Sequence, residues 1–137
     1  MTAPLRQQRR NIGLGENQAD LAQVLSLLLD MQPDLRCSGT AATCAGVLQL
    51  AQAVAMDGWL LDLTLDDGSS LPIITALRAA NSRAAIVVMT GLGSAAIDAG
   101  CLSAGADAVI PKDGQVLRLL VALRQHLRPP DPRATQA

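Results

Sequence analysis

The sequence predicts an α/β fold: a five-stranded parallel sheet of strand order 2-1-3-4-5, flavodoxin-like and doubly wound, with five helices. Short apolar runs, typical of buried strands, alternate along the chain with longer segments whose apolar residues recur at helical spacing. Strands that are joined through helices run parallel and carry helices on both faces of the sheet. Right-handed crossovers then leave few topologies, and this order is the flavodoxin-like one.

The first two strands and helices differ in the strength of their signals. Residues 11–15 are a weak strand candidate because they include two glycines, and the order of elements is the main reason to expect a strand there. Residues 19–31 are predicted as a helix with an apolar face, and residues 35–40 as a short strand. Residues 43–55 form the second predicted helix, with Thr43 as its N-cap. The apolar face of the first helix consists of Leu21, Val24, Leu25 and Leu28.

The third strand is a short apolar run, residues 59–62, that ends in the carboxylate of Asp62. A loop with two more acids, a glycine and two serines follows it. The third helix is then expected over residues 71–81. Ser70 can cap this helix, and Pro72 lies near the first helical position, where its missing N–H costs nothing.

The last two strands and helices complete the pattern. Residues 85–89 give the clearest buried strand of the sequence, and residues 94–104 a helix of small residues that ends at Gly105. Residues 108–110 are the fifth strand. Residues 114–127 form the closing helix, because its apolar residues fall on one stripe.

The composition favours one domain with a hydrophobic core and excludes several classes of function. Half of the 137 residues are apolar, the net charge is −1, and the only aromatic residue is one tryptophan. A nucleic-acid-binding surface needs a basic excess and stacking rings, so we expect none. The longest apolar stretch, residues 24–29, is too short to span a membrane, and the first ten residues are no secretory signal. We therefore expect a cytoplasmic protein.

Both ends of the chain have the composition of flexible segments. Residues 1–10 are polar and basic, and we expect a loose arm there. Residues 128–137 contain three prolines among polar residues, and we expect a disordered tail. The folded domain is then predicted to comprise residues 11–127.

Four polar residues stand at the carboxyl ends of the predicted strands, which is where such sheets bind their ligands. Glu16 follows the first strand, Asp62 ends the third, Thr90 follows the fourth and Lys112 follows the fifth. Glu16 is the single glutamate of the sequence and Lys112 its single lysine. We therefore expect these side chains to converge on one site.

The residue types at this edge suit a hard cation and a phosphoryl group. Mg²⁺ prefers oxygen ligands and retains water, so one or two carboxylates and phosphate oxygens suffice. Asp62 can act as an oxygen nucleophile toward a phosphoryl donor and form an aspartyl phosphate. Lys112 can contact a phosphoryl oxygen as a compact cation, and Thr90 can donate a hydroxyl hydrogen bond.

Three segments give the sequence a resemblance to a known family. Residues 60–65 carry Asp62, residues 87–91 end in Thr-Gly, and residues 104–113 contain the Gly-Ala-Asp and Pro-Lys-Asp sequences. Together, and in this order of elements, they resemble the receiver domain of bacterial two-component response regulators. The resemblance extends over almost all of the predicted domain.

The resemblance implies a role in phosphorelay signalling rather than an enzyme activity of the ordinary kind. A sensor histidine kinase or phosphotransfer protein would transfer its phosphoryl group to Asp62, with Thr90 and Lys112 contacting that group. Mg²⁺ would be bound by Glu16, Asp62 and the backbone carbonyl of Thr64. Phosphorylation would then change partner binding, or homodimerisation through the fourth helix, fifth strand and fifth helix.

The sequence departs from the family pattern at four positions. Gly15 stands where the family usually has one of two adjacent acids, and the acid that remains, Glu16, is one methylene longer than usual. Asp66 replaces a proline, Val109 an aromatic residue, and Asp113 the proline that usually follows the lysine. The missing acid predicts weaker Mg²⁺ binding.

These departures leave an alternative open. In this alternative the chain is a pseudo-receiver, a protein-interaction module that works without phosphorylation. Gly15, Asp66 and Val109 favour this alternative. Asp66 or Asp67 can replace the lost acid at the metal site, although acids in loops are more often simply solvated. A flavodoxin-like enzyme is disfavoured, because the sequence has no glycine-rich phosphate loop and no aromatic rings to enclose a flavin.

Overall fold

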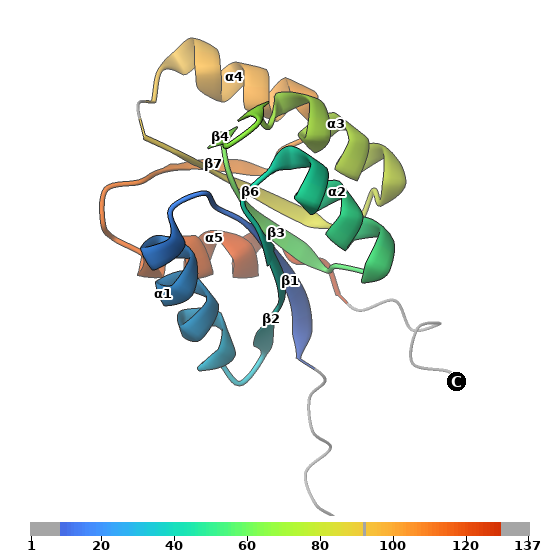
Figure 1. Cartoon of the computed structure of the whole chain (residues 1–137), viewed down its shortest axis with the longest axis vertical. Coiled ribbons are helices and arrows are strands. Elements are labelled where there is room, and N and C mark those ends of the chain that lie inside the picture. Colours follow the sequence, from blue (N-terminus) through green and yellow to red (C-terminus); the bar gives the residue numbers. More distant parts are fainter. Residues whose placement is uncertain (1–8, 92, 130–137) are drawn as a thin grey trace, which may run out of the picture.

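A five-stranded parallel sheet with helices on both faces forms the fold (Figure 1). The structure is a computed structural model that describes residues 9–91 and 93–129. The strand order is β2-β1-β3-β6-β7, which is the predicted order, because β4 and β5 form a separate two-stranded hairpin. In chain order the elements are β1 (Arg10–Gly15), α1 (Ala19–Asp30), β2 (Leu35–Ala41), α2 (Cys44–Ala53), β3 (Gly58–Asp62), β4 (Thr64–Leu65), β5 (Gly68–Ser69), α3 (Leu71–Ala80), β6 (Ala85–Thr90), α4 (Ala95–Ala104), β7 (Ala108–Pro111) and α5 (Leu117–His126).

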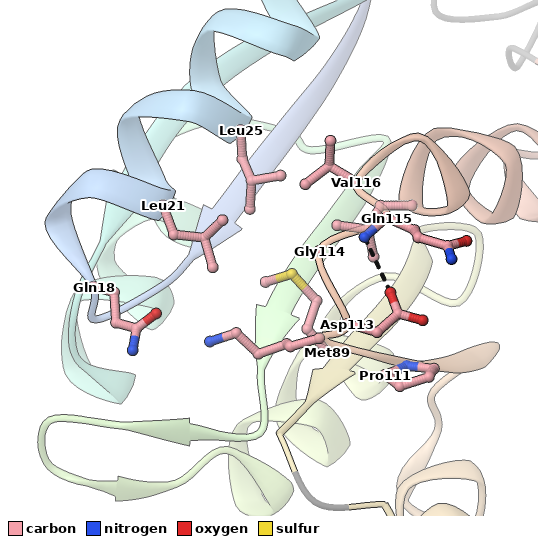
Figure 2. A pocket seen from close by; sticks show the side chains of 11 residues that line it. Gln18, Leu21, Leu25, Met89, Pro111, Asp113, Gly114, Gln115 and Val116 are labelled. Atoms are coloured by element: carbon pink, nitrogen blue, oxygen red, sulfur yellow. Dashed lines mark hydrogen bonds between the residues drawn. The ribbon is translucent and has the colours of Figure 1, made fainter.

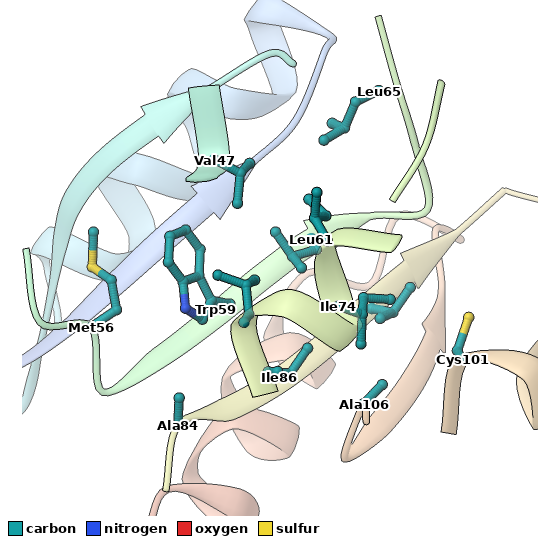
Figure 3. Close-up of a cluster of buried hydrophobic side chains, with 13 residues drawn as sticks. Val47, Met56, Trp59, Leu61, Leu65, Ile74, Ala84, Ile86, Cys101 and Ala106 are labelled. Carbon is teal, nitrogen blue, oxygen red and sulfur yellow. The ribbon is translucent and has the colours of Figure 1, made fainter. Parts of the chain in front are cut away.

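The sheet separates two hydrophobic clusters. One cluster lies under α2, α3 and α4 and includes Trp59 and Leu61 of β3, which point to the same face because alternate residues of a strand do so (Figure 3). The other lies under α1 and α5 and includes Leu60. The strands β3 and β6 are buried along their whole length, as their continuous apolar sequences predict.

The glycines that weaken the first strand in sequence have a packing role in β1. The ring of Trp59 lies against Gly13 on the neighbouring strand, and a Cβ at position 13 would overlap that ring. The close approach of Trp59 to the β1 backbone therefore requires glycine at this position.

Two helix details differ from the sequence prediction. Helix α5 begins at Leu117 rather than at Gly114, because Gly114 has a φ of +85°, which is outside the helical region. On α1, Val24 is half-exposed, and the buried residues are Leu25 and Leu29. The apolar residues of α1 cover more of the helix surface than is buried, so their spacing alone does not identify the residues that face the sheet.

The N-caps of α2 and α3 show where side-chain capping was predicted correctly and where it was not. The Thr43 hydroxyl accepts a hydrogen bond from Gly46 N at 2.9 Å, as predicted. Ser70 occupies the N-cap position of α3, but its hydroxyl donates to the Leu63 carbonyl at 3.1 Å instead of capping. The Ser69 hydroxyl accepts from Leu71 N.

The segment after Asp62, expected as a loop, contains the β4–β5 hairpin, which is attached to α2. Asp67 Oδ1 accepts a hydrogen bond from Cys44 N at 2.6 Å, and Asp67 Oδ2 accepts one from Ala45 N at 3.2 Å. These are free N–H groups at the first turn of α2, where a carboxylate is favourable. Asp67 thus serves as a second cap of α2 and holds the hairpin there.

The expected arm and tail lie largely outside the described residues. Arg10 is the first residue of β1, and its Nη2 donates a hydrogen bond to the Arg128 carbonyl at 2.7 Å. Arg83 Nη2 donates to the Pro129 carbonyl at 2.6 Å. Among the described residues, no helix has both the length and the apolar character needed to cross a membrane.

Burial and the contact with Asp67 both disfavour the reactive thiolate form of Cys44. Burial, together with the hydrogen bond to Asp67 and its negative charge, raises the pKa of Cys44 to about 11. We expect Cys44 to react slowly with iodoacetamide at about pH 8, because little thiolate is present. Asp67→Asn keeps an oxygen that can cap α2 but removes the charge, and we expect several-fold faster alkylation. Mass spectrometry of the peptide that contains Cys44 measures both rates. Alkylation of native Cys44 as fast as in the denatured chain would contradict this prediction.

Candidate functional site

Three of the predicted site residues meet at the carboxyl edge of the sheet. Lys112 Nζ lies 2.9 Å from Asp62 Oδ2 and 3.1 and 3.2 Å from the two carboxylate oxygens of Glu16. Glu16 follows β1 and Asp62 ends β3, which are neighbouring strands, while Lys112 follows the edge strand β7. The parallel sheet therefore brings together residues that are far apart in sequence.

The three side chains are largely buried, and burial disfavours their charged forms unless the charges are paired. The side chain of Glu16 is fully buried, that of Asp62 is 8% exposed and that of Lys112 is 18% exposed. Burial raises the pKa of Glu16, although the hydrogen bond from Lys112 opposes this effect. Burial also disfavours the charged form of Lys112, but hydrogen bonds to Asp62 and Glu16 outweigh it and raise the pKa of the ammonium. Lys112 therefore favours the ionised form of Glu16, whereas burial and the charge of Asp62 oppose it.

Thr90 and Thr64 contact the site through the backbone. Thr90 is buried at the end of β6, and its carbonyl accepts a hydrogen bond from Lys112 N at 2.7 Å. Thr64 N donates to Asp62 Oδ1 at 3.1 Å. Asp62 is thus held by Thr64 on one oxygen and by Lys112 on the other.

A pocket of about 450 Å³ opens above this group and gives access to it from solvent. Asp62, Thr64 and Lys112 line it, together with two amide side chains, Asn17 and Gln18. Gln18 N also donates a hydrogen bond to Glu16 Oε1 at 3.2 Å. The sequence prediction did not include Asn17 and Gln18. Their position directly after Glu16, in the turn that follows β1, could have identified them as site residues.

The position of the missing acid, Gly15, has apolar surroundings. A Cβ at position 15 would lie 2.9 Å from Leu61 Cδ2, 3.1 Å from Val47 Cγ2 and 3.7 Å from Leu65 Cδ1. All three neighbours belong to the hydrophobic cluster under α2, α3 and α4. The nearest neighbours of a side chain at this position would therefore be apolar.

The two loop acids do not contact Asp62 within the described part of the chain. The Asp67 carboxylate is bound to the first turn of α2, as described above. Asp66 is exposed, and its backbone N–H donates to the Ala42 carbonyl. The carboxylates that meet at Lys112 are those of Glu16 and Asp62.

The chemistry of this donor set fits Mg²⁺. Among the described residues, no group of three or more His, Cys, Asp or Glu side chains is placed to bind a metal. Mg²⁺ does not need such a group, because it binds through one or two carboxylates and keeps several waters. Glu16 and Asp62 supply two carboxylates beside an open pocket, which meets this requirement.

Comparisons with known proteins agree on one family. The family model described as "Response regulator receiver domain" matches residues 13–124. The response regulator domain of Thermotoga maritima CheB has a similar structure, with a TM-score of 0.79 at 20% sequence identity, over 90% of this chain and 100% of that one. A CheY-like receiver domain protein from Methanospirillum hungatei JF-1 has a TM-score of 0.80 at 19% identity, over 88% of this chain and 94% of that one.

A more similar sequence belongs to a response regulator from Burkholderia pseudomallei, solved with a phosphorylated aspartic acid, a calcium ion and citrate. It is 27% identical, with a TM-score of 0.76, over 83% of this chain and 66% of that one. No curated protein matches the sequence.

The environment of Gly15 yields a prediction about restoring the missing acid. We expect Gly15→Asp to lower the free energy of unfolding by at least about 3 kcal/mol, because the carboxylate would be buried among leucine and valine without a partner. Gly15→Asn, which has the same shape but no charge, should cost less. Gly15→Ala should cost about 1 kcal/mol, since the nearest contact is the end of a flexible leucine side chain. Urea unfolding of the three variants measures this order. A Gly15→Asp variant as stable as wild type would contradict it.

Proposed function

Because the chain belongs to the response regulator receiver domain family, we propose that it accepts a phosphoryl group on Asp62 from a histidine kinase or phosphotransfer protein. The observation that carries the proposal is the position of the Lys112 ammonium, 2.9 Å from Asp62 Oδ2 at the floor of an open pocket. A carboxylate and a fixed cation at an accessible site suit an incoming phosphoryl group. Receiver domains in general are phosphorylated and bind Mg²⁺.

The proposed transfer assigns a task to each residue. A carboxylate oxygen of Asp62 attacks phosphorus, a P–O bond forms, and the P–N bond to the donor imidazole breaks. Lys112 and Thr64 N orient the carboxylate before the attack, through the contacts described above. Lys112 then neutralises charge on the phosphoryl oxygens, and the Thr90 hydroxyl donates a hydrogen bond to one of them.

Mg²⁺ is part of this proposal. Glu16, Asp62 and the Thr64 carbonyl would hold it, and when bound it neutralises charge on the transferred group. The site has one acid fewer than the family pattern, so we propose that it binds Mg²⁺ more weakly than a receiver with both acids. The Burkholderia pseudomallei regulator was solved with both a phosphorylated aspartic acid and a calcium ion, and a divalent ion in this chain is compatible with that.

We propose that the phosphoryl donor docks against α1. An apolar pocket lies between α1 and the segment that joins β7 to α5 (Figure 2), and Lys112 is one of the residues that line it. Leu21 and Leu25 of α1 line it. On its outer face, α1 exposes Val24 (51%) and Leu27 (57%) to solvent. The helix begins just after Glu16, and Leu27 lines a surface pocket together with Glu16 and Asn17, so a partner that delivers a phosphoryl group to Asp62 can contact this face.

The predicted homodimer has less structural support than the docking surface on α1. Homodimerisation through α4, β7 and α5 stays a prediction, and half-exposed Leu102 on α4 and Val121 on α5 are compatible with it. Direct binding of nucleic acid is not part of the proposal.

A pseudo-receiver is the second candidate function. The apolar surroundings of Gly15 favour it, because they leave the metal with fewer ligands. Val109 favours it too: this half-buried residue of β7 packs against the cluster that contains Trp59, and it has no aromatic ring that could respond to Thr90. Such a module would bind its partner through the same surfaces without phosphorylation.

Acetyl phosphate distinguishes the two candidates. With Mg²⁺, we expect the wild-type chain to gain the mass of one phosphoryl group, because a small donor reaches the open pocket without a docking partner. Asp62→Asn should abolish the gain, since an amide is a poor nucleophile. Asp66→Asn, the same substitution on an exposed acid, should leave it intact. Intact mass spectrometry measures the gain. No gain at any concentration of Mg²⁺ and acetyl phosphate would favour the pseudo-receiver.

The docking surface is tested separately. We expect Val24→Gln with Leu27→Gln to slow phosphoryl transfer from a histidine phosphotransfer protein by about tenfold or more, because exposed apolar anchors contribute strongly to such interfaces. Transfer from acetyl phosphate should not change. Leu102→Gln on α4, which is equally apolar and 50% exposed, is the matched control. Equal rates for the α1 variant and wild type would place the docking surface elsewhere.

A further inference from the structure

We propose that Asp98 of α4 accepts a hydrogen bond from the Thr90 hydroxyl when Asp62 carries no phosphoryl group. Phosphorylation would then transfer this hydroxyl from α4 to the phosphoryl group. The inference deepens the proposed function and rests on it for the hydrogen bond that Thr90 donates to the phosphoryl group. Asp98 is a positioning residue in this scheme, because it acts on the site through Thr90.

Asp98 has a carboxylate oxygen that needs a donor. Its Oδ1 is buried and accepts no hydrogen bond from the part of the chain that the structure describes. Burial, and in addition the negative charge of Asp98, raises the pKa of the Cys101 thiol, which is buried one turn further along α4. The Asp98 carboxylate therefore lies toward the interior side of α4. A buried acceptor without a donor is unfavourable, so a donor within reach would be bound.

The Thr90 hydroxyl lies across a small space from this oxygen. Thr90 is 2% exposed, so its hydroxyl needs an acceptor within the protein. A Cβ at position 93 would lie 3.6 Å from Thr90 Oγ1 and 4.0 Å from Asp98 Oδ1, so both oxygens border the space beside Gly93. Rotation of the two side chains about their Cα–Cβ bonds brings a donor and an acceptor together there.

The Thr90 hydroxyl has one proton and donates to one acceptor at a time. In the phosphorylated chain that acceptor would be a phosphoryl oxygen, and Asp98 would lose its donor. The buried carboxylate would then favour a different position of α4. Val109 leaves β7 without an aromatic ring that could follow Thr90. Asp98 would thus give this chain a link between Thr90 and α4.

Gly93 offers a substitution that keeps the two oxygens apart. In Gly93→Ala the new methyl group would meet both oxygens at ordinary contact distances, and the φ of Gly93 is not positive, so alanine is tolerated there. Gly100→Ala on α4, where a Cβ meets nothing within 4 Å, is the matched control.

Nuclear magnetic resonance of the unphosphorylated chain tests the contact directly. We expect a slowly exchanging Thr90 hydroxyl proton in wild type and in Gly100→Ala, because a hydrogen bond to a carboxylate protects it. Asp98→Leu and Gly93→Ala should both lose this signal. A Thr90 hydroxyl signal that persists in Asp98→Leu, or that is absent from wild type, would overturn the proposal.

A double-mutant cycle measures the same contact through stability. Thr90→Val keeps the shape of the side chain but removes the donor. We expect it to reduce the folding equilibrium constant by a factor about fivefold or more larger in wild type than in Asp98→Leu, since wild type alone loses the hydrogen bond. Thr90→Ser, which retains the hydroxyl, should show no such difference. Urea unfolding measures the constants, and equal effects of Thr90→Val in the two backgrounds would refute the contact.

The proposed function can fail without this contact failing. Neither measurement uses a phosphoryl donor, so a chain that gains no mass from acetyl phosphate can still show the bond between Thr90 and Asp98. If the chain is phosphorylated, we expect Asp98→Leu to reach half-maximal phosphorylation at a concentration of acetyl phosphate about threefold or more below that of wild type, because Thr90 then leaves no acceptor. Equal concentrations would show that Asp98 does not compete with the phosphoryl group, and would overturn the proposed transfer of Thr90.

Discussion

The site depends on one buried ammonium between two buried carboxylates. Glu16 and Asp62 end neighbouring strands, so the sheet holds them close together whether or not their charges are balanced. Without a cation at this place, both would pay the cost of burial and repel each other. Lys112 contacts both at once, although it follows β7, a strand that is adjacent to neither β1 nor β3. A polar site can therefore exist at the edge of a sheet that is otherwise apolar.

The apolar packing next to the site limits which residues the site can contain. Trp59 packs against Gly13, and Leu61 lies next to Gly15, so two glycines of β1 accommodate side chains of β3. Leu65, from the hairpin that Asp67 attaches to α2, also lies close to Gly15. Glycine at position 15 is thus part of the packing under α2, and we expect that a substitution at that position alone would not restore an acidic pair.

The sequence predicted the sheet order and nearly every element, because buried strands and amphipathic helices have distinct periods. It also predicted which residues stand at the carboxyl edge, since in a parallel sheet that edge follows from the order of elements alone. It did not predict the roles of Asp67 or Gln18. Asp67 caps a helix that precedes it by more than twenty residues, and Gln18 contacts the site through its backbone N–H. Such contacts depend on the exact path of loops, which has no periodic signal.

The connections of Lys112 explain how a change at Asp62 can reach both β6 and β7. Its side chain holds Asp62 and Glu16, and its backbone N–H is bonded to the carbonyl of Thr90 at the end of β6. With Val109 on β7 in place of an aromatic ring, the chain has no large side chain there that could turn when Thr90 moves. If Asp62 is phosphorylated as proposed, the new charge would act first on Lys112, and through its backbone on the segment that follows β7. In this chain the lysine joins the chemical site to the neighbouring strands.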